Sequence, residues 1–88
     1  MFRTEAWLNK WFVARGAGVL GLDENYFDAG AIDSFGVIEL IEAVESHYGI
    51  SFRQHDFQDR RFPTIRGLAE ILGDRIAEHL ERERLHQG

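Results

Sequence analysis

The sequence contains no cysteine, so it can form no disulfide framework, and thiol chemistry would need a thiol from another molecule. It also has no apolar run near the roughly 20 residues that span a bilayer. The first residues, MFRTEAWLNKWF, carry charges where a signal peptide would be continuously apolar. These absences predict a soluble cytoplasmic protein without membrane insertion. Because 88 residues suffice for one modest core, we expect a single domain over residues 1–88.

Basic residues are missing from the middle of the chain. Residues 16–52 contain no lysine or arginine, although acidic residues are frequent there. The acids are Asp23, Glu24, Asp28, Asp33, Glu39, Glu42 and Glu45. Such a stretch repels nucleic acid and favours a cationic partner, so we predict no nucleic-acid binding.

The common signatures of catalytic and metal sites are absent as well. A nucleophile elbow would need G-x-S-x-G, and Ile32 stands at the first glycine position before Ser34. The histidines form no H-x-x-x-H pair, and none lies near Ser34 in sequence. The twelve residues DENYFDAGAIDS have the length of a calcium loop but end on serine rather than glutamate. We therefore predict neither an enzyme nor a metal site.

Hydrophobic periodicity predicts an all-α chain, a small four-helix bundle with a long loop between the first two helices. The first helix covers residues 4–15, where Trp7, Leu8, Trp11 and Phe12 recur at helical spacing. The loop over residues 22–32 has three expected anchors, which are Leu22, Phe27 and Ile32. The second helix begins at Ser34 and ends at Gly49, and its buried stripe comprises Val37, Leu40, Ile41, Val44 and Tyr48.

The remaining elements follow the second helix. We expect a short helical turn over residues 56–61 and a last helix that Thr64 caps after Pro63. The buried face of that helix comprises Ile65, Leu68, Ala69, Leu72, Ile76 and Leu80. We expect its tail to fray from about residue 82. Four side chains from different elements are predicted to face inward, namely Trp11, Phe27, Val44 and Leu72.

Ser34 is the residue whose role the pattern leaves open. As an N-cap, its hydroxyl would accept a backbone N–H and contribute about 1 kcal/mol. Its surroundings suit a cap less well, because Val37 replaces the Glu or Gln of a capping box and Gly36 weakens the helix. A small residue beside an exposed hydroxyl leaves room for another molecule, and a helix N-terminus favours a phosphate. The sequence therefore indicates a serine that carries a phosphate.

The segments FDAGAIDSFGVIELIEAVESHYGI and FPTIRGLAEIL resemble the acyl carrier and peptidyl carrier proteins, which carry 4′-phosphopantetheine. The matching positions are Phe27, Gly30, Asp33, Ser34, Phe35, Leu40, Thr64 and Ile65. The resemblance implies that Ser34 is the attachment serine, with Asp33 and Gly36 beside the cofactor. The prosthetic group, which comes from coenzyme A, would supply the thiol that this chain lacks.

Within that family the chain looks most like the D-alanyl carrier proteins and related discrete aminoacyl carriers. Phe57, Phe62 and Thr64 match that group, whereas Phe35 replaces its usual Met or Leu and Ile65 its frequent Pro. The resemblance implies a monomeric carrier of an acyl or aminoacyl thioester. Its partners would be a phosphopantetheinyl transferase, a loading ligase and a downstream acyltransferase or synthase.

Four residues of the second helix are candidates for binding these partners. Phe35 follows the attachment serine directly, and Glu39, Glu42 and Glu45, here called the acidic strip, lie three residues apart. We expect Glu39 and Glu45 to be exposed and to steer cationic enzyme surfaces. Two alternatives stay open, which are a helical interaction module without a prosthetic group and a small hydrolase that uses Ser34.

Overall fold

The computed structural model describes residues 3–18 and 20–87, and within them it is entirely helical apart from loops and one isolated β-bridge. Its elements are α1 (Arg3–Ala14), α2 (Ser34–Tyr48), the 3-10 helix η1 (Gln54–Gln58) and α3 (Ile65–Gln87). No strand occurs in the described ranges, and the all-α prediction is confirmed. The structure has three α-helices, because the expected third helix is only the short η1.

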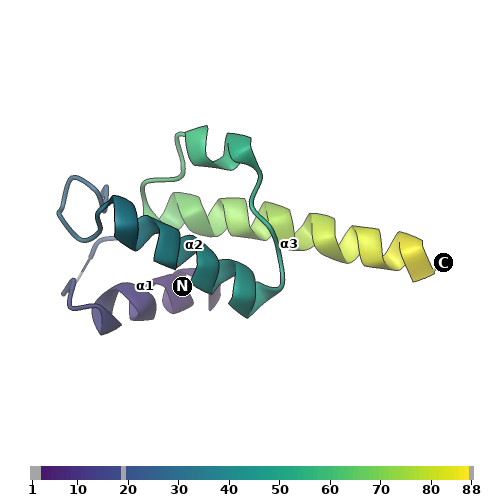
Figure 1. Cartoon of the computed structure of the whole chain (residues 1–88), viewed down its shortest axis with the longest axis horizontal. Helices are drawn as coiled ribbons and strands as arrows, with labels where there is room; N and C mark the ends of the chain where they lie inside the picture. Colours follow the sequence, from purple (N-terminus) through teal and green to yellow (C-terminus); the bar gives the residue numbers. More distant parts are fainter. Residues whose placement is uncertain (1–2, 19, 88) are drawn as a thin grey trace.

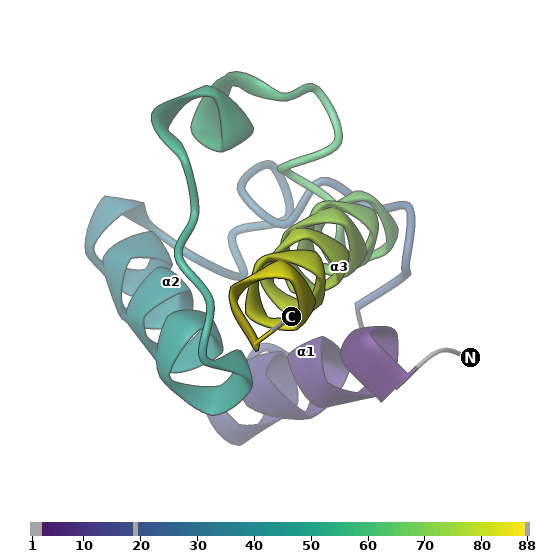
Figure 2. The same cartoon turned by 90° about the vertical axis from the view of Figure 1, so that its right-hand side faces the viewer.

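The three α-helices enclose one core. Figure 2 looks along α3 and shows α1, α2 and the segment that contains η1 arranged around it. Eight side chains with no exposed surface come from all three helices, namely Leu8, Phe12, Leu40, Val44, Ile65, Leu68, Ile71 and Leu72. Burial of each such side chain stabilises the fold by roughly 1.5–3 kcal/mol, so this shared core holds the helices together.

The inward-facing predictions are confirmed for Val44 and Leu72, and Trp11 packs against the core while partly exposed. The prediction for Phe27 is wrong, because its side chain is 39% exposed. Its neighbour Tyr26 is buried instead, because its hydroxyl donates a hydrogen bond to the Phe62 carbonyl. Burial raises the pKa of the Tyr26 hydroxyl.

The two predicted ends of α2 and α3 have local causes that the structure shows. Gly49 ends α2 in the left-handed conformation, with φ 66°, and donates its N–H to the Glu45 carbonyl. Thr64 caps α3, since its Oγ1 accepts the Gly67 N–H at 3.0 Å. Both predictions are confirmed.

The predicted bounds of the third element are wrong, because η1 covers Gln54–Gln58 rather than residues 56–61. The buried Asp56 carboxylate accepts the Arg53 N–H at 2.8 Å and so starts the turn early. Asp59 then has an extended backbone, with ψ 130°, which ends it.

The inner face of α3 is shorter than expected. Leu80 was predicted to be buried and is 59% exposed, because α3 extends past the other elements toward its C-terminal end (Figure 1). The structure continues α3 as a helix to Gln87. The expected fraying from about residue 82 concerns motion and stays a prediction.

Candidate functional site

Ser34 is the first residue of α2, and its side chain is exposed. The interpretation of Ser34 as the N-cap is wrong, because Asp33 holds that position. The extended backbone of Asp33 directs its Oδ1 over the first turn, where it accepts the Gly36 N–H at 2.7 Å. Within the described residues the Ser34 hydroxyl has no hydrogen-bond partner, so it remains available to another molecule.

Gly36 is small for a reason that the sequence did not reveal. It is buried, and a Cβ at this position would lie 2.7 Å from Ile32 Cγ1 and 3.2 Å from Asp33 Oδ1. Ile32 of the preceding loop therefore fills the space on the Cβ side of Gly36, while Gly36 and Asp33 also line a hollow of about 310 Å³. Gly36 positions Ser34 through this packing, and its direct contact with a cofactor stays a prediction.

The loop before α2 is fastened to the start of α3. Tyr26 donates its N–H to the Pro63 carbonyl at 2.9 Å and its hydroxyl to the Phe62 carbonyl. Arg66 donates its N–H to the Leu22 carbonyl at 2.9 Å. These bonds join segments about forty residues apart, and they fix the place at which α2 begins.

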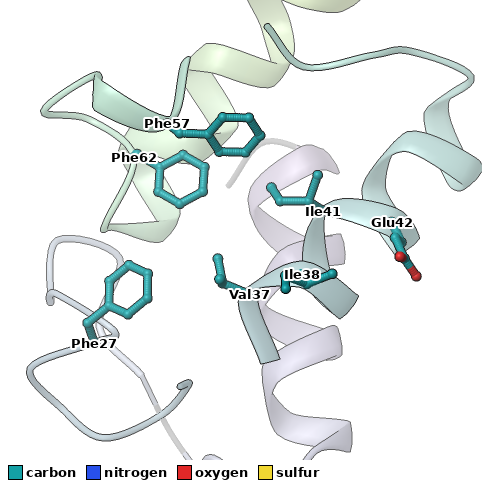
Figure 3. A pocket seen from close by; sticks show the side chains of 7 residues that line it. All are labelled: Phe27, Val37, Ile38, Ile41, Glu42, Phe57 and Phe62. Carbon is teal, nitrogen blue, oxygen red and sulfur yellow. The ribbon is translucent and has the colours of Figure 1, made fainter. Parts of the chain in front are cut away.

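An apolar hollow of about 460 Å³ starts one helical turn after Ser34. Phe27, Phe57 and Phe62 face Val37 and Ile41 of α2 across it (Figure 3). This hollow explains why Phe27 lies outside the core.

Two exposed apolar side chains at this face were not predicted. Ile38 is 56% exposed and Phe57 is 47% exposed, and both line the hollow. The sequence held one signal for an exposed apolar face, because Ile38 is an apolar residue outside the buried stripe of α2. Phe35 is 78% exposed next to Ser34, as expected for a contact residue.

The acidic strip is less uniform than its spacing suggested. Glu39 pairs with Arg15 at 2.7 Å, and the Arg15 guanidinium also lies 4.7 Å from the centre of the Trp11 ring. The prediction of a freely exposed Glu45 is wrong, because its carboxylate is half-buried and accepts the Phe52 N–H at 2.8 Å. Glu42 is exposed at the rim of the apolar hollow, with its oxygens directed away from the rings (Figure 3).

The histidines with described side chains are engaged away from Ser34. His47 stacks on Trp7, with ring centroids 4.9 Å apart. His55 Nε2 lies 3.6 Å from Asp56, and His79 Nε2 lies 3.2 Å from Glu83. Among the side chains that the structure describes, which exclude His86, no group of three His, Asp or Glu could hold a metal ion. No helix in the same ranges is both long enough and apolar enough to cross a membrane.

A family model described as a phosphopantetheine attachment site matches residues 13–72, which include Ser34 and its surroundings. The chain belongs to this family of carrier domains. The match confirms the resemblance seen in the sequence and, with it, the cofactor, covalently attached 4′-phosphopantetheine. The carrier domain holds acyl or aminoacyl groups on that cofactor.

Similar proteins include a polyketide synthase and several D-alanyl carrier proteins. The chain is 40% identical over 65 residues to the polyketide synthase PksL of Bacillus subtilis, a match that covers 74% of this chain and 1% of that protein. It is 44% identical over 54 residues to a D-alanyl carrier protein of Streptococcus mutans, covering 57% and 68% of the two chains. The chain is 36% identical over 55 residues to the D-alanyl carrier protein of Streptococcus suis, a match that covers 58% of this chain and 70% of that protein. The match therefore spans about one hundredth of the synthase. No solved structure matches the chain.

The residues around Ser34 fit the cofactor of this family. An exposed serine hydroxyl without a partner among the described residues can form a phosphodiester, and the helix dipole at the start of α2 favours its negative charge. Asp33 and Gly36 hold the backbone on both sides of Ser34. The geometry thus presents the hydroxyl outward on a fixed helix end.

Proposed function

We propose that Ser34 is the serine to which 4′-phosphopantetheine is attached, and that the chain is a carrier and not an enzyme. The observation that carries this proposal is the exposed Ser34 hydroxyl, without a partner among the described residues, at the capped start of α2. It lies within the range that the family model matches. The fold that we propose is the carrier bundle in which η1 takes the place of the third helix.

The chain does not activate Ser34 by itself. No base among the described side chains forms a hydrogen bond with the hydroxyl, so a separate transferase takes its proton. The role of Asp33 and Gly36 is to orient the hydroxyl, which both do through the backbone of the first turn. When bound, the cofactor supplies a thiol for the thioester, in a chain that contains no cysteine.

The proposed cargo is a small acyl or aminoacyl group of the kind that D-alanyl carrier proteins carry. Support comes from the identity of 44% to one such carrier, and from a match that covers 68% of that protein's length. The proposed partners are a phosphopantetheinyl transferase, a loading ligase and a downstream acyltransferase or synthase. A monomeric state and a cytoplasmic location stay predictions.

The surface that we propose for these partners is the exposed face of α2 next to Ser34. Phe35 and Ile38 present apolar side chains there, and Glu42 adds a negative charge. Glu39 contributes less charge than the sequence suggested, because Arg15 pairs with it. Glu45 supports the segment after α2 through its bond to the Phe52 N–H.

Intact mass spectrometry tests the attachment site. Incubation with coenzyme A and a transferase of broad specificity should add one phosphopantetheinyl group to the chain. Ser34→Ala should abolish the mass increase, whereas Ser46→Ala, which changes another exposed serine of α2, should leave it unchanged. Circular dichroism should show the same helix content for both variants.

Two outcomes would contradict the proposal. Modification of the Ser34→Ala variant would show that another residue is the attachment site. A wild-type chain that stays unmodified under conditions in which a known carrier is modified would favour the interaction module without a prosthetic group.

A further inference from the structure

A second hollow lies at the other end of α2, between the segment after that helix and α3. Its volume is about 200 Å³, and its polar lining includes Ser51, Arg53, Arg75, Glu78 and Arg82. Because α2 has 15 residues and a helix rises about 1.5 Å per residue, this hollow is roughly 20 Å from Ser34. It is therefore separate from the attachment site.

Three arginines of this hollow converge on one carboxylate. Glu78 accepts hydrogen bonds from Arg82 Nη2 at 2.8 Å and from Arg75 Nη1 at 3.0 Å, and it also pairs with Arg53. A second carboxylate, Asp56, is buried, and its Oδ2 lies 3.7 Å from Arg75 Nε. The lining itself holds three arginines against one carboxylate, Glu78. The carboxylates of Asp56 and Glu83 lie near the lining but are not part of it. The nearby His79 has its own partner in Glu83.

The guanidinium groups keep donors that the two carboxylates do not use. Arg75 Nε is buried and donates no hydrogen bond to any acceptor among the described residues. The side chains of Arg53 and Arg82 are 44% and 69% exposed, so their remaining N–H groups are open to solvent. Each guanidinium carries five N–H donors in a planar fork that matches a carboxylate or phosphate.

We propose that this hollow binds an oxyanion, either free phosphate or the carboxylate of an acidic partner segment. The three arginines and single carboxylate of the lining give an excess of positive charge, which opposes the partial charge of about −0.5 at the end of α2. The volume of about 200 Å³ suffices for such a group, since a water molecule takes up about 30 Å³ in the liquid. Arg53 and Arg82, whose side chains are exposed, bind the oxyanion from the solvent side of the hollow. The largely buried Arg75 contributes positive charge from the protein side.

Titration followed by two-dimensional NMR tests this proposal on the full chain at constant ionic strength. One arm uses inorganic phosphate, and the other uses a blocked peptide of three aspartates, so that the two sources of the oxyanion are distinguished. We expect saturable shifts of the Ser51 and Arg53 amide signals in at least one arm. Arg82→Gln should weaken the binding by about tenfold, as for the loss of a charge-assisted hydrogen bond.

The matched control is Arg84→Gln. Arg84 is also exposed on α3 and also pairs with a glutamate, Glu81, and its replacement removes the same charge. The control should bind the anion as the wild type does. Shifts that rise without saturation in both arms, or equal weakening in the Arg82 and Arg84 variants, would overturn the proposal. Arg53→Gln gives a second test on a different segment of the chain. These outcomes do not depend on whether Ser34 is modified.

Discussion

At the scale of single residues, the glycines inside the helices show three different surroundings. A Cβ on Gly36 would press on Ile32, and a Cβ on Gly67 would collide with the backbone of Arg61. A Cβ on Gly73 would meet nothing within 4 Å. Only the first two glycines are therefore required by packing.

Alanine at Gly73 and at Gly67 should have opposite effects on the free energy of unfolding. Gly73→Ala should stabilise the protein by about 0.5–1 kcal/mol, because alanine is the better helix former and the space is open. Gly67→Ala should destabilise it by roughly 1–3 kcal/mol, because the Arg61 backbone must move. Urea unfolding of both variants measures the two values, and changes of the same sign would contradict this packing.

Residue-level prediction from the sequence failed where no periodicity guides it. In the loop before α2, the sequence favoured Phe27 as the buried anchor, and the structure buries Tyr26. Both are aromatic neighbours, and the choice depends on carbonyl groups at Phe62 and Pro63, far along the chain. The hydroxyl of Tyr26 has a partner inside the protein, whereas Phe27 lines the apolar hollow.

At the scale of elements, the start of α2 separates two tasks between adjacent residues. The Asp33 carboxylate accepts the Gly36 N–H of the first turn, and Ser34 keeps its hydroxyl exposed. A residue that had to cap the helix would have its oxygen engaged. The division therefore leaves Ser34 free for a covalent bond without loss of the cap.

Alanine variants at these two positions should differ in stability. Asp33→Ala should lower the free energy of unfolding by about 1 kcal/mol through loss of the cap. Ser34→Ala should change it by less than about 0.5 kcal/mol, the usual range for exposed positions. Asp28→Ala, which removes an exposed acid from the same loop, is the control for charge and should also be close to neutral. A larger loss for Ser34→Ala than for Asp33→Ala in thermal or urea unfolding would show that Ser34 is the cap.

The helices themselves could be predicted because their signals are local. Apolar residues at helical spacing mark α1, α2 and α3, and Gly49 and Thr64 mark two of their ends. The bounds of η1 could not be predicted, since they depend on where Asp56 finds its donor. Such short turns carry too few residues for a periodic pattern.

At the scale of the whole molecule, the charge distribution differs from the one along the sequence. Residues 16–52 contain no lysine or arginine, yet Arg15 pairs with Glu39 and Arg66 pairs with Asp23, both at 2.7 Å. These partners are 24 and 43 residues apart in sequence. No count of charges along the chain predicts such pairs, so the one-sided charge of this stretch is partly neutralised in the fold.

Reversal of the remaining exposed charge near Ser34 should slow modification. Glu42→Lys should lower kcat/KM of the transferase severalfold at low salt if its docking surface is cationic, with little change in stability. The difference from wild type should shrink toward 1 M salt, where the Debye length is about 3 Å.

The control for this prediction is Glu81→Lys. It changes the net charge by the same amount on the part of α3 that extends away from the start of α2 (Figure 1). Equal rates for the two variants across the salt range would show that only the net charge matters, and that the position of Glu42 does not.

The hydrogen bonds between the loop before α2 and the start of α3 also determine when, during synthesis, Ser34 reaches its final position. The acceptors for Tyr26 are carbonyls of Phe62 and Pro63, and the donor for Leu22 is the N–H of Arg66. A nascent chain that has emerged only as far as η1 contains Ser34 but none of these partners. The loop can then pack on α1 but lacks these hydrogen bonds, so we expect the serine to gain its fixed position only after the first turn of α3 has left the ribosome.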